Sequence, residues 1–144
     1  MIEQDTIRLL RECDAGVKMG VKSIDDVIKY TQSSQLYEML SDCKAEHEKI
    51  DTEIQNELCR YEDEGKNPNP VVKGMSKMKT AMKMAVNESD KTVASIITDG
   101  CNMGVKSLSK YLNEYKAADE RSKDIAKKLI SVEEALAVNI RGYL

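Results

Sequence analysis

The stretch GVKMGVKS at residues 16–23 recurs as GCNMGVKS at residues 100–107, with six of the eight positions identical at an offset of 84. An internal repeat of this kind indicates a duplicated supersecondary unit. Both copies lie in segments whose apolar residues recur every three or four positions, which is the spacing of one face of an α-helix. The repeat therefore decides the architecture, because it predicts that one helical element is used twice.

The correspondence continues beyond the repeated stretch. Ile24 matches Leu108 at the same offset, and the helices that follow match at an offset of 86. We therefore expect two helical hairpins, over about 5–65 and about 88–144, that bury their apolar faces against each other. The matched positions of the second helices are Met39, Leu40, Cys43, Ile50, Ile54 and Leu58 with Ile125, Ala126, Leu129, Leu136, Ile140 and Leu144.

The apolar spacing predicts four long helices in one domain over residues 1–144. A serine in the turn between the first and second helices, Ser33 or Ser34, is expected to cap the second helix by accepting a hydrogen bond from its free backbone N–H groups. A break near 117–119 separates the last two helices. The predicted spans are about 5–30, from the serine cap to about 65, about 89–115, and from the break to the C-terminus.

A long connection of about 66–87 joins the two hairpins. Its first residues, KNPNP at 66–70, cannot be helical throughout, because proline lacks a donor and disfavours helix in the residue before it. The following stretch VVKGMSKMKTAMKMAV, residues 71–86, has apolar residues at helical spacing and predicts a short fifth helix, either a crossover laid over the bundle or a helix that meets a membrane surface or a partner. Such a connection can run the length of the bundle and leave the second and third helices parallel.

On these features the chain resembles the ferritin-like superfamily of four-helix bundles, and most closely a bacterial ferritin-like family of unassigned function. The resemblance rests on the duplicated G-x-x-MGVKS stretches, the two hairpins and the crossover, and it covers nearly the whole chain. It implies an all-α, ferritin-like four-helix bundle. In di-iron members of the superfamily, two helices each carry a Glu and the other two each carry a Glu-x-x-His.

The residues that a di-iron centre needs are missing from this sequence. His47 is the only histidine, and a lysine stands three residues before it. The central inner positions of the first and third helices are Gly20 and Gly104, not acids. The sequence therefore predicts no metal, no cofactor and no catalytic residue. If a metal is held at all, its ligands are expected to be Cys43, His47 and Glu133, with Asp14 at the edge.

His47 and Glu133 correspond to each other at the offset of 86. If the hairpins pack about a pseudo-twofold axis, both side chains lie at one level of the core. Because a buried carboxylate without a partner is costly, we expect the two to bond directly or through water. The alternative is that the second helix is rotated and His47 sits at a wet boundary.

Gly20 and Gly104 lie on the inner stripes, where glycine costs about 1 kcal/mol relative to alanine. We assign them a structural role, either close helix approach or space for a large neighbour. The alternative is a small ligand cavity beside them.

Charge and cysteine content bound the function. The net charge of −3 argues against a general nucleic-acid binder. The first residues contain no basic start followed by an apolar run, so no signal peptide or stable membrane insertion is expected, and a cytoplasmic setting follows. There the cysteines are expected to be small buried hydrophobes: Cys13, Cys43, Cys59 and Cys101.

The charges are unevenly distributed along the chain. Residues 38–64 hold ten acids against three Lys or Arg, whereas residues 66–87 hold five lysines and no acid. This pattern indicates either two solvated faces or self-association through complementary patches.

No phosphate loop, Ser/His/Asp set or clustered acid and base is present. We therefore expect a non-enzymatic structural or interaction protein that forms a homodimer and has protein partners. The alternatives are a metal-binding protein or oxidoreductase with an atypical site around His47 and Glu133, and a small-ligand binder.

Overall fold

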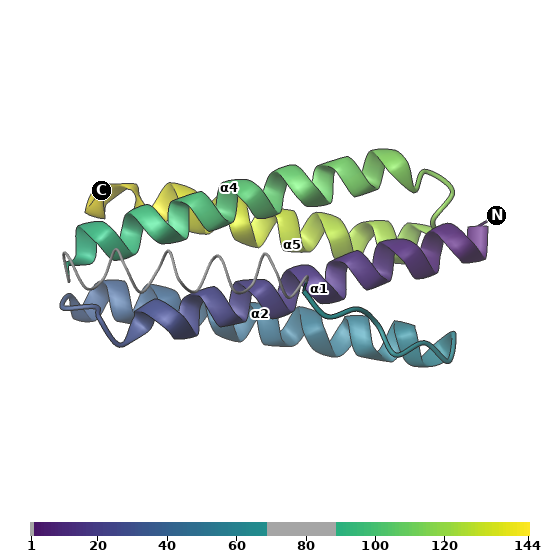
Figure 1. Cartoon of the computed structure of the whole chain (residues 1–144), viewed down its shortest axis with the longest axis horizontal. Helices are drawn as coiled ribbons and strands as arrows, with labels where there is room; N and C mark the ends of the chain where they lie inside the picture. Colours follow the sequence, from purple (N-terminus) through teal and green to yellow (C-terminus); the bar gives the residue numbers. More distant parts are fainter. Residues whose placement is uncertain (1, 69–88) are drawn as a thin grey trace.

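The computed structural model describes residues 2–68 and 89–144. Within them the chain forms four long α-helices, a short terminal 3₁₀ helix and no strand, which confirms the prediction of an all-α protein. The helices are α1 (Ile2–Ile28), α2 (Ser34–Arg60), α4 (Asp90–Glu114) and α5 (Glu120–Asn139), followed by η1 (Ile140–Tyr143). They lie lengthwise against one another (Figure 1): α1 packs on α2, α4 and α5, and α5 also packs on α2 and α4. The predicted fifth helix, residues 71–86, lies outside the described residues.

Side-chain caps set the start of three helices. Ser33, Ser89 and Asp119 each accept a hydrogen bond from the backbone N–H three residues further on. Each cap satisfies one of the N–H groups that have no partner within the helix. Of the two serines considered for the second helix, Ser33 is therefore the cap.

Two helices were predicted to extend too far at their C-terminal ends. The first helix ends at Ile28 rather than near 30, and the second ends at Arg60 rather than near 65. After Arg60 the backbone takes positive φ at Glu62 (55°) and Gly65 (83°), a left-handed conformation that cannot continue an α-helix.

Contacts at the two ends of the bundle fix the direction of each helix. The hydroxyl of Tyr61, just after α2, donates to Asp119 in the turn between α4 and α5 at 3.4 Å. At the opposite end, the backbone N–H groups of Gln32 and Ser33 donate to Asp90 at the start of α4, at 2.7 and 3.0 Å. Hence α2 and α4 run parallel, and the end of α2 and the start of α4 lie at opposite ends of the bundle (Figure 1).

The apolar core has two halves. One half lies toward the start of α1 and the other toward its end, and each draws on all four helices. A fully buried Leu or Ile contributes about 2 kcal/mol. The buried residues of the first half are Leu9, Leu10, Cys13, Val17, Ile50, Ile54, Leu58, Leu108, Ala118, Ile125, Ala126 and Leu129. Those of the second half are Ile24, Val27, Leu36, Leu40, Cys43, Val93, Ala94, Ile97, Cys101, Leu136 and Ile140.

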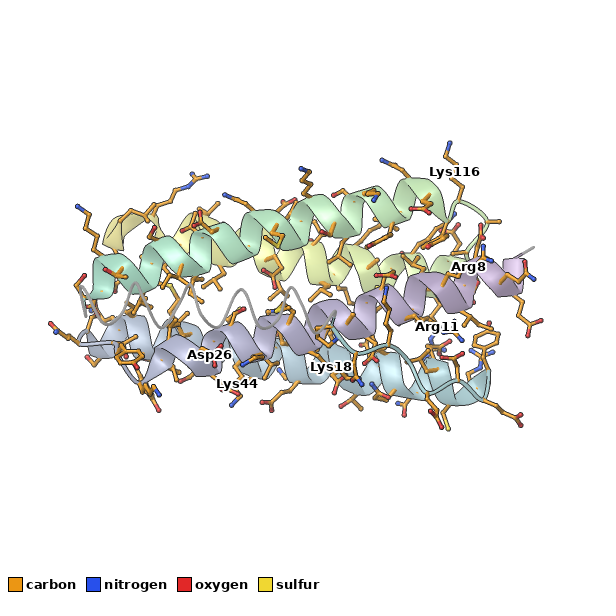
Figure 2. All side chains as sticks on the ribbon, in the orientation of Figure 1. Arg8, Arg11, Lys18, Asp26, Lys44 and Lys116 are labelled. Carbon is orange, nitrogen blue, oxygen red and sulfur yellow. The ribbon has the colours of Figure 1, made fainter. Side chains whose placement is uncertain are left out.

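Charged side chains cover the outside of the bundle. Arg8 and Lys116 project at the end where α1 begins and α4 ends, while Lys18, Asp26 and Lys44 project along the α1–α2 side (Figure 2). No described helix has the length and apolar run that crossing a bilayer requires.

The cysteine prediction is right at three positions and wrong at one. Cys13, Cys43 and Cys101 are buried and unpaired, but Cys59 is exposed. Cys59 lies about 100° around α2 from Leu58 and about 200° from Glu57, and both of those residues are buried. Its side chain therefore faces solvent.

Candidate functional site

A polar layer separates the two halves of the core, and His47 of α2 and Glu133 of α5 form its centre. The Nε2 atom of His47 lies 2.6 Å from Oε1 of Glu133. The two residues are only 1% and 8% exposed. The predicted direct pairing is therefore present, and His47 does not sit at a wet boundary.

The second ring nitrogen of His47 limits where protons can be. Its Nδ1 lies 2.8 Å from the carbonyl oxygen of Cys43. Because a carbonyl only accepts, Nδ1 must carry a hydrogen and donate it. Then Nε2 either donates to a carboxylate as part of an imidazolium or accepts from a protonated Glu133. Both arrangements hold one proton between the side chains, so the pair is net neutral in either case.

The surroundings favour the imidazolium form. Burial of the ring opposes its protonation, but the hydrogen bonds to Cys43 and Glu133 and the charge of Glu133 outweigh it and raise the pKa of His47 to about 10. At neutral pH the layer is therefore a charge-assisted hydrogen bond, which is stronger than a neutral one.

Glycine makes room for this pair on α1. A Cβ atom at Gly20 would lie 2.6 Å from Nε2 of His47 and 3.3 Å from Oε1 of Glu133. No side chain fits there while the pair stays in place. On α4 the nearest atoms to a Cβ at Gly104 belong to Glu133, at 3.6 Å, which is an ordinary contact. The two repeated glycines thus face the same pair, but only Gly20 is sterically required.

Two thiols adjoin the pair. The Sγ atom of Cys43, one turn before His47, lies 3.6 Å from Nδ1. Burial raises the pKa of the Cys101 thiol well above its ordinary value, and the charge of Glu133 and a hydrogen bond to it act in the same direction. Because the thiolate is the form that binds metal and reacts, Cys101 is held in its inert form.

These donors do not fit a di-iron centre. Such a centre needs several carboxylates and two imidazoles, whereas this layer offers one of each. Both nitrogens of His47 are already hydrogen-bonded, so a metal would have to displace Glu133 or Cys43. Cys43, His47 and Glu133 do lie together, but no group of three or more His, Cys, Asp or Glu in residues 2–68 and 89–144 is arranged to hold a metal ion.

Two buried acids were not recognised from the sequence as core residues. Asp14 accepts hydrogen bonds from the Lys18 ammonium and the Lys66 backbone N–H, both at 2.9 Å, and from the Gln55 amide at 2.8 Å. It fastens the segment after α2 to α1. Gly65 lies so close to Asp14 that a Cβ there would clash with its Oδ2.

The second buried acid, Glu57, joins α2 to α5. It accepts from Arg121 at 2.8 Å and from Arg60 at 3.1 Å. The burial of both acids could have been inferred from their positions in the sequence. Asp14 follows the buried Cys13 and Glu57 precedes the buried Leu58, so each lies at the edge of an apolar stripe.

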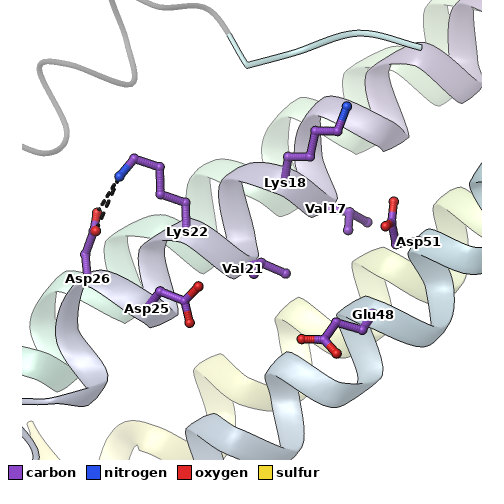
Figure 3. A pocket seen from close by; sticks show the side chains of 8 residues that line it. All are labelled: Val17, Lys18, Val21, Lys22, Asp25, Asp26, Glu48 and Asp51. Carbon is purple, nitrogen blue, oxygen red and sulfur yellow. Dashed lines mark hydrogen bonds and ion pairs between the residues drawn. The ribbon is translucent and has the colours of Figure 1, made fainter. Parts of the chain in front are cut away.

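An open groove of about 400 Å³ lies on the surface between α1 and α2 (Figure 3). We call it the α1–α2 groove. It was not anticipated, and Gly20 and Gly104 do not line it. Its lining residues are two valines, two lysines and four acids: Val17, Val21, Lys18, Lys22, Asp25, Asp26, Glu48 and Asp51.

The polar layer is thus a buried, neutral pair without free donors, and the α1–α2 groove is open and charged. These are the two features from which function can be argued. Comparisons with protein-family models, with curated proteins and with solved structures give no match for this chain.

Proposed function

We propose that this protein is a non-enzymatic structural or interaction module with a ferritin-like bundle, in which the His47–Glu133 pair takes the place of a metal centre. One observation carries the proposal: each ring nitrogen of His47 is used inside the protein, one by Glu133 and the other by the Cys43 carbonyl. A side chain with no free lone pair cannot act as a ligand or as a base toward an outside molecule.

The parallel course of α2 and α4 supports the ferritin-like part of the proposal. A four-helix bundle with one long crossover has this topology. Further support comes from the repeat, because Gly20 and Gly104 correspond at the offset of 84 and both face the pair. A pseudo-twofold axis through the pair would produce these contacts. The fifth helix in the crossover remains part of the proposal.

A cytoplasmic homodimer is the form in which we expect the module to work. The unpaired thiols of Cys13, Cys43 and Cys101 suit a reducing compartment. A dimer would also bring the acidic part of the chain into contact with its lysine-rich part.

Metal binding is the second candidate, because Cys43, His47 and Glu133 share one layer and Cys101 lies against Glu133. Thiols and an imidazole are ligands that zinc accepts. Binding would require the 2.6 Å hydrogen bond to open, which sets the metal against an existing interaction.

Elemental analysis of protein purified without chelators separates the two candidates. We expect no stoichiometric iron, manganese or zinc, and no heat of binding when each ion is titrated into the protein by calorimetry. One equivalent of any of these metals in the wild type, lost in His47→Ala but kept in the surface variant Glu134→Ala, would overturn the proposal in favour of metal binding.

A further inference from the structure

The α1–α2 groove combines an apolar floor with acidic walls. Val17 is buried and Val21 is half-buried at its base. Asp25 of α1 and Glu48 of α2 point into the space between the two helices, whereas the lysines of α1 point away from α2 (Figure 3). A side chain entering the groove would therefore meet aliphatic carbon below it and carboxylates beside it.

The lysines that line the groove neutralise only part of its negative charge. Lys22 pairs with Asp26 at 3.2 Å, and Lys18 is held by the buried Asp14 at 2.9 Å. Asp25 is paired from outside, with Lys44 at 2.7 Å.

Two of the acids that line the groove, both on α2, form no salt bridge within the described residues. Neither Glu48 nor Asp51 forms a salt bridge with a described residue, and Asp51 accepts only from the neutral amide of Gln55. The groove thus carries an excess of negative charge on successive turns of one helix.

The repeat provides an internal control for this charge. At the offsets of 84 and 86, Val21 and Glu48 correspond to Val105 and Glu134, so the second hairpin keeps the same frame. The other acids are not kept, although the second hairpin folds like the first. The fold therefore does not need them. Asp25, Asp26 and Asp51 correspond to Ser109, Lys110 and Ala137.

An aliphatic chain that ends in an ammonium group fits such a groove best. Lysine buries its methylenes on apolar surface and keeps its charge at a polar edge. This chain contains a concentrated source of lysine, because residues 71–86 hold four lysines, several methionines and no acid. The charges of this stretch and of the groove are complementary.

We propose that the α1–α2 groove of one copy binds lysine side chains from residues 71–86 of a second copy. Each copy can offer its groove to the lysines of the other copy, and these two equivalent contacts about one twofold axis form a closed dimer. This inference rests on the proposed interaction function and names its partner. The groove is lined by eight residues, whereas a standard interface uses roughly 20–30 residues per partner, so the dimer is expected to be weak and sensitive to salt.

Sedimentation equilibrium of the full chain tests the proposal. The variant D25S/D26K/D51A replaces three acids of the groove by the residue types found at the corresponding positions of the second hairpin. The variant K73Q/K77Q/K79Q/K83Q removes the positive charges of residues 71–86. With an exposed ion pair contributing roughly a 2- to 5-fold change, we expect either variant to weaken dimerisation at least 10-fold in 50 mM NaCl. In 500 mM NaCl the wild type is expected to weaken similarly.

The matched control is E38S/D42K/E134A, which makes the same change in net charge at exposed positions outside the groove. It should dimerise like the wild type, and circular dichroism should show that every variant is folded. A wild type that stays monomeric, or a dimer that survives either variant, would overturn this inference. If the wild type is a metal-free monomer, the proposed dimer contact is wrong but the proposal of a non-enzymatic module stands. If the wild type holds stoichiometric metal, the proposal of a non-enzymatic module is wrong, and the dimer contact is still judged by sedimentation.

Discussion

Adding one methyl group at each repeated glycine is expected to have opposite effects. In a helix, alanine is favoured over glycine by about 1 kcal/mol, so without new contacts both substitutions would stabilise. Gly104→Ala brings the new Cβ no closer than 3.6 Å to Glu133, and it should stabilise by up to about 1 kcal/mol. Gly20→Ala places its Cβ 2.6 Å from Nε2 and 2.8 Å from Cδ2 of His47.

The ring cannot easily move away from the new methyl group, because both of its nitrogens are hydrogen-bonded. A charge-assisted hydrogen bond contributes about 1.5–3 kcal/mol, and overpacking a core costs about 1–3 kcal/mol. When both costs apply they add, and after subtracting about 1 kcal/mol for helix propensity we expect Gly20→Ala to destabilise by about 1.5–5 kcal/mol.

Urea unfolding followed by circular dichroism at 222 nm measures both changes. Gly100→Ala is the control, because nothing lies within 4 Å of a Cβ at this exposed position of α4, and it should stabilise like Gly104→Ala. If Gly20→Ala were as stable as the wild type, the pair would not occupy the space beside α1, and the steric reasoning would be refuted.

Three further predictions concern the buried polar groups. His47→Ala leaves Glu133 buried without its imidazolium partner and should cost about 3–5 kcal/mol in urea unfolding, whereas H47L/E133M should recover most of that loss. Because the pKa of folded His47 lies near 10, above its ordinary value of 6.5, the stabilisation is complete below about pH 6.5 and is lost as pH rises toward 10, by at most about 1.4 kcal/mol per pH unit in denaturant titrations. Gly65→Ala should release the segment after α2, because φ is 83° and the new Cβ meets Asp14; it should cost about 2 kcal/mol and speed trypsin cleavage after Lys66.

Each of these predictions has a control in the same chain. Loss of the exposed Glu134 should leave stability within about 0.5 kcal/mol of the wild type, unlike loss of His47. The decline between pH 6.5 and 10 should be absent in H47L/E133M, and a decline of equal slope there would assign it to other groups. Gly142→Ala has no neighbour within 4 Å, and unchanged cleavage in Gly65→Ala would contradict the fastening role of Asp14.

The sequence was most informative where two positions could be compared. The offset of 86 related His47 to Glu133, and in the structure their side chains lie 2.6 Å apart, at one level of the two packed hairpins. The environment of a residue was harder to predict where the repeat offered no corresponding position for comparison. Cys59 was expected inside from its residue type, but its side chain is rotated about 100° from the buried Leu58.

Features that depend on how two helices face each other could not be predicted from either helix alone. The α1–α2 groove needs the angle and separation of α1 and α2, which no spacing of residues encodes. The role of Asp14 depends on Gly65 and Lys66 returning to α1 after α2 has ended. The early end of α2 followed from backbone conformation at Glu62, where glutamate gives no warning of a positive φ.

The bond between His47 and Glu133 has a consequence for which hairpins can pack together around it. Because the two side chains occupy corresponding positions, a symmetric assembly of two identical hairpins would place imidazole against imidazole, or carboxylate against carboxylate, in its centre. Two imidazoles or two carboxylates can share one proton, but such a pair then carries a net charge of +1 or −1, which burial disfavours, whereas the His47–Glu133 pair is neutral. A neutral central pair therefore requires two unlike hairpins on one polypeptide, and it cannot form at the centre of a symmetric assembly of two identical hairpins.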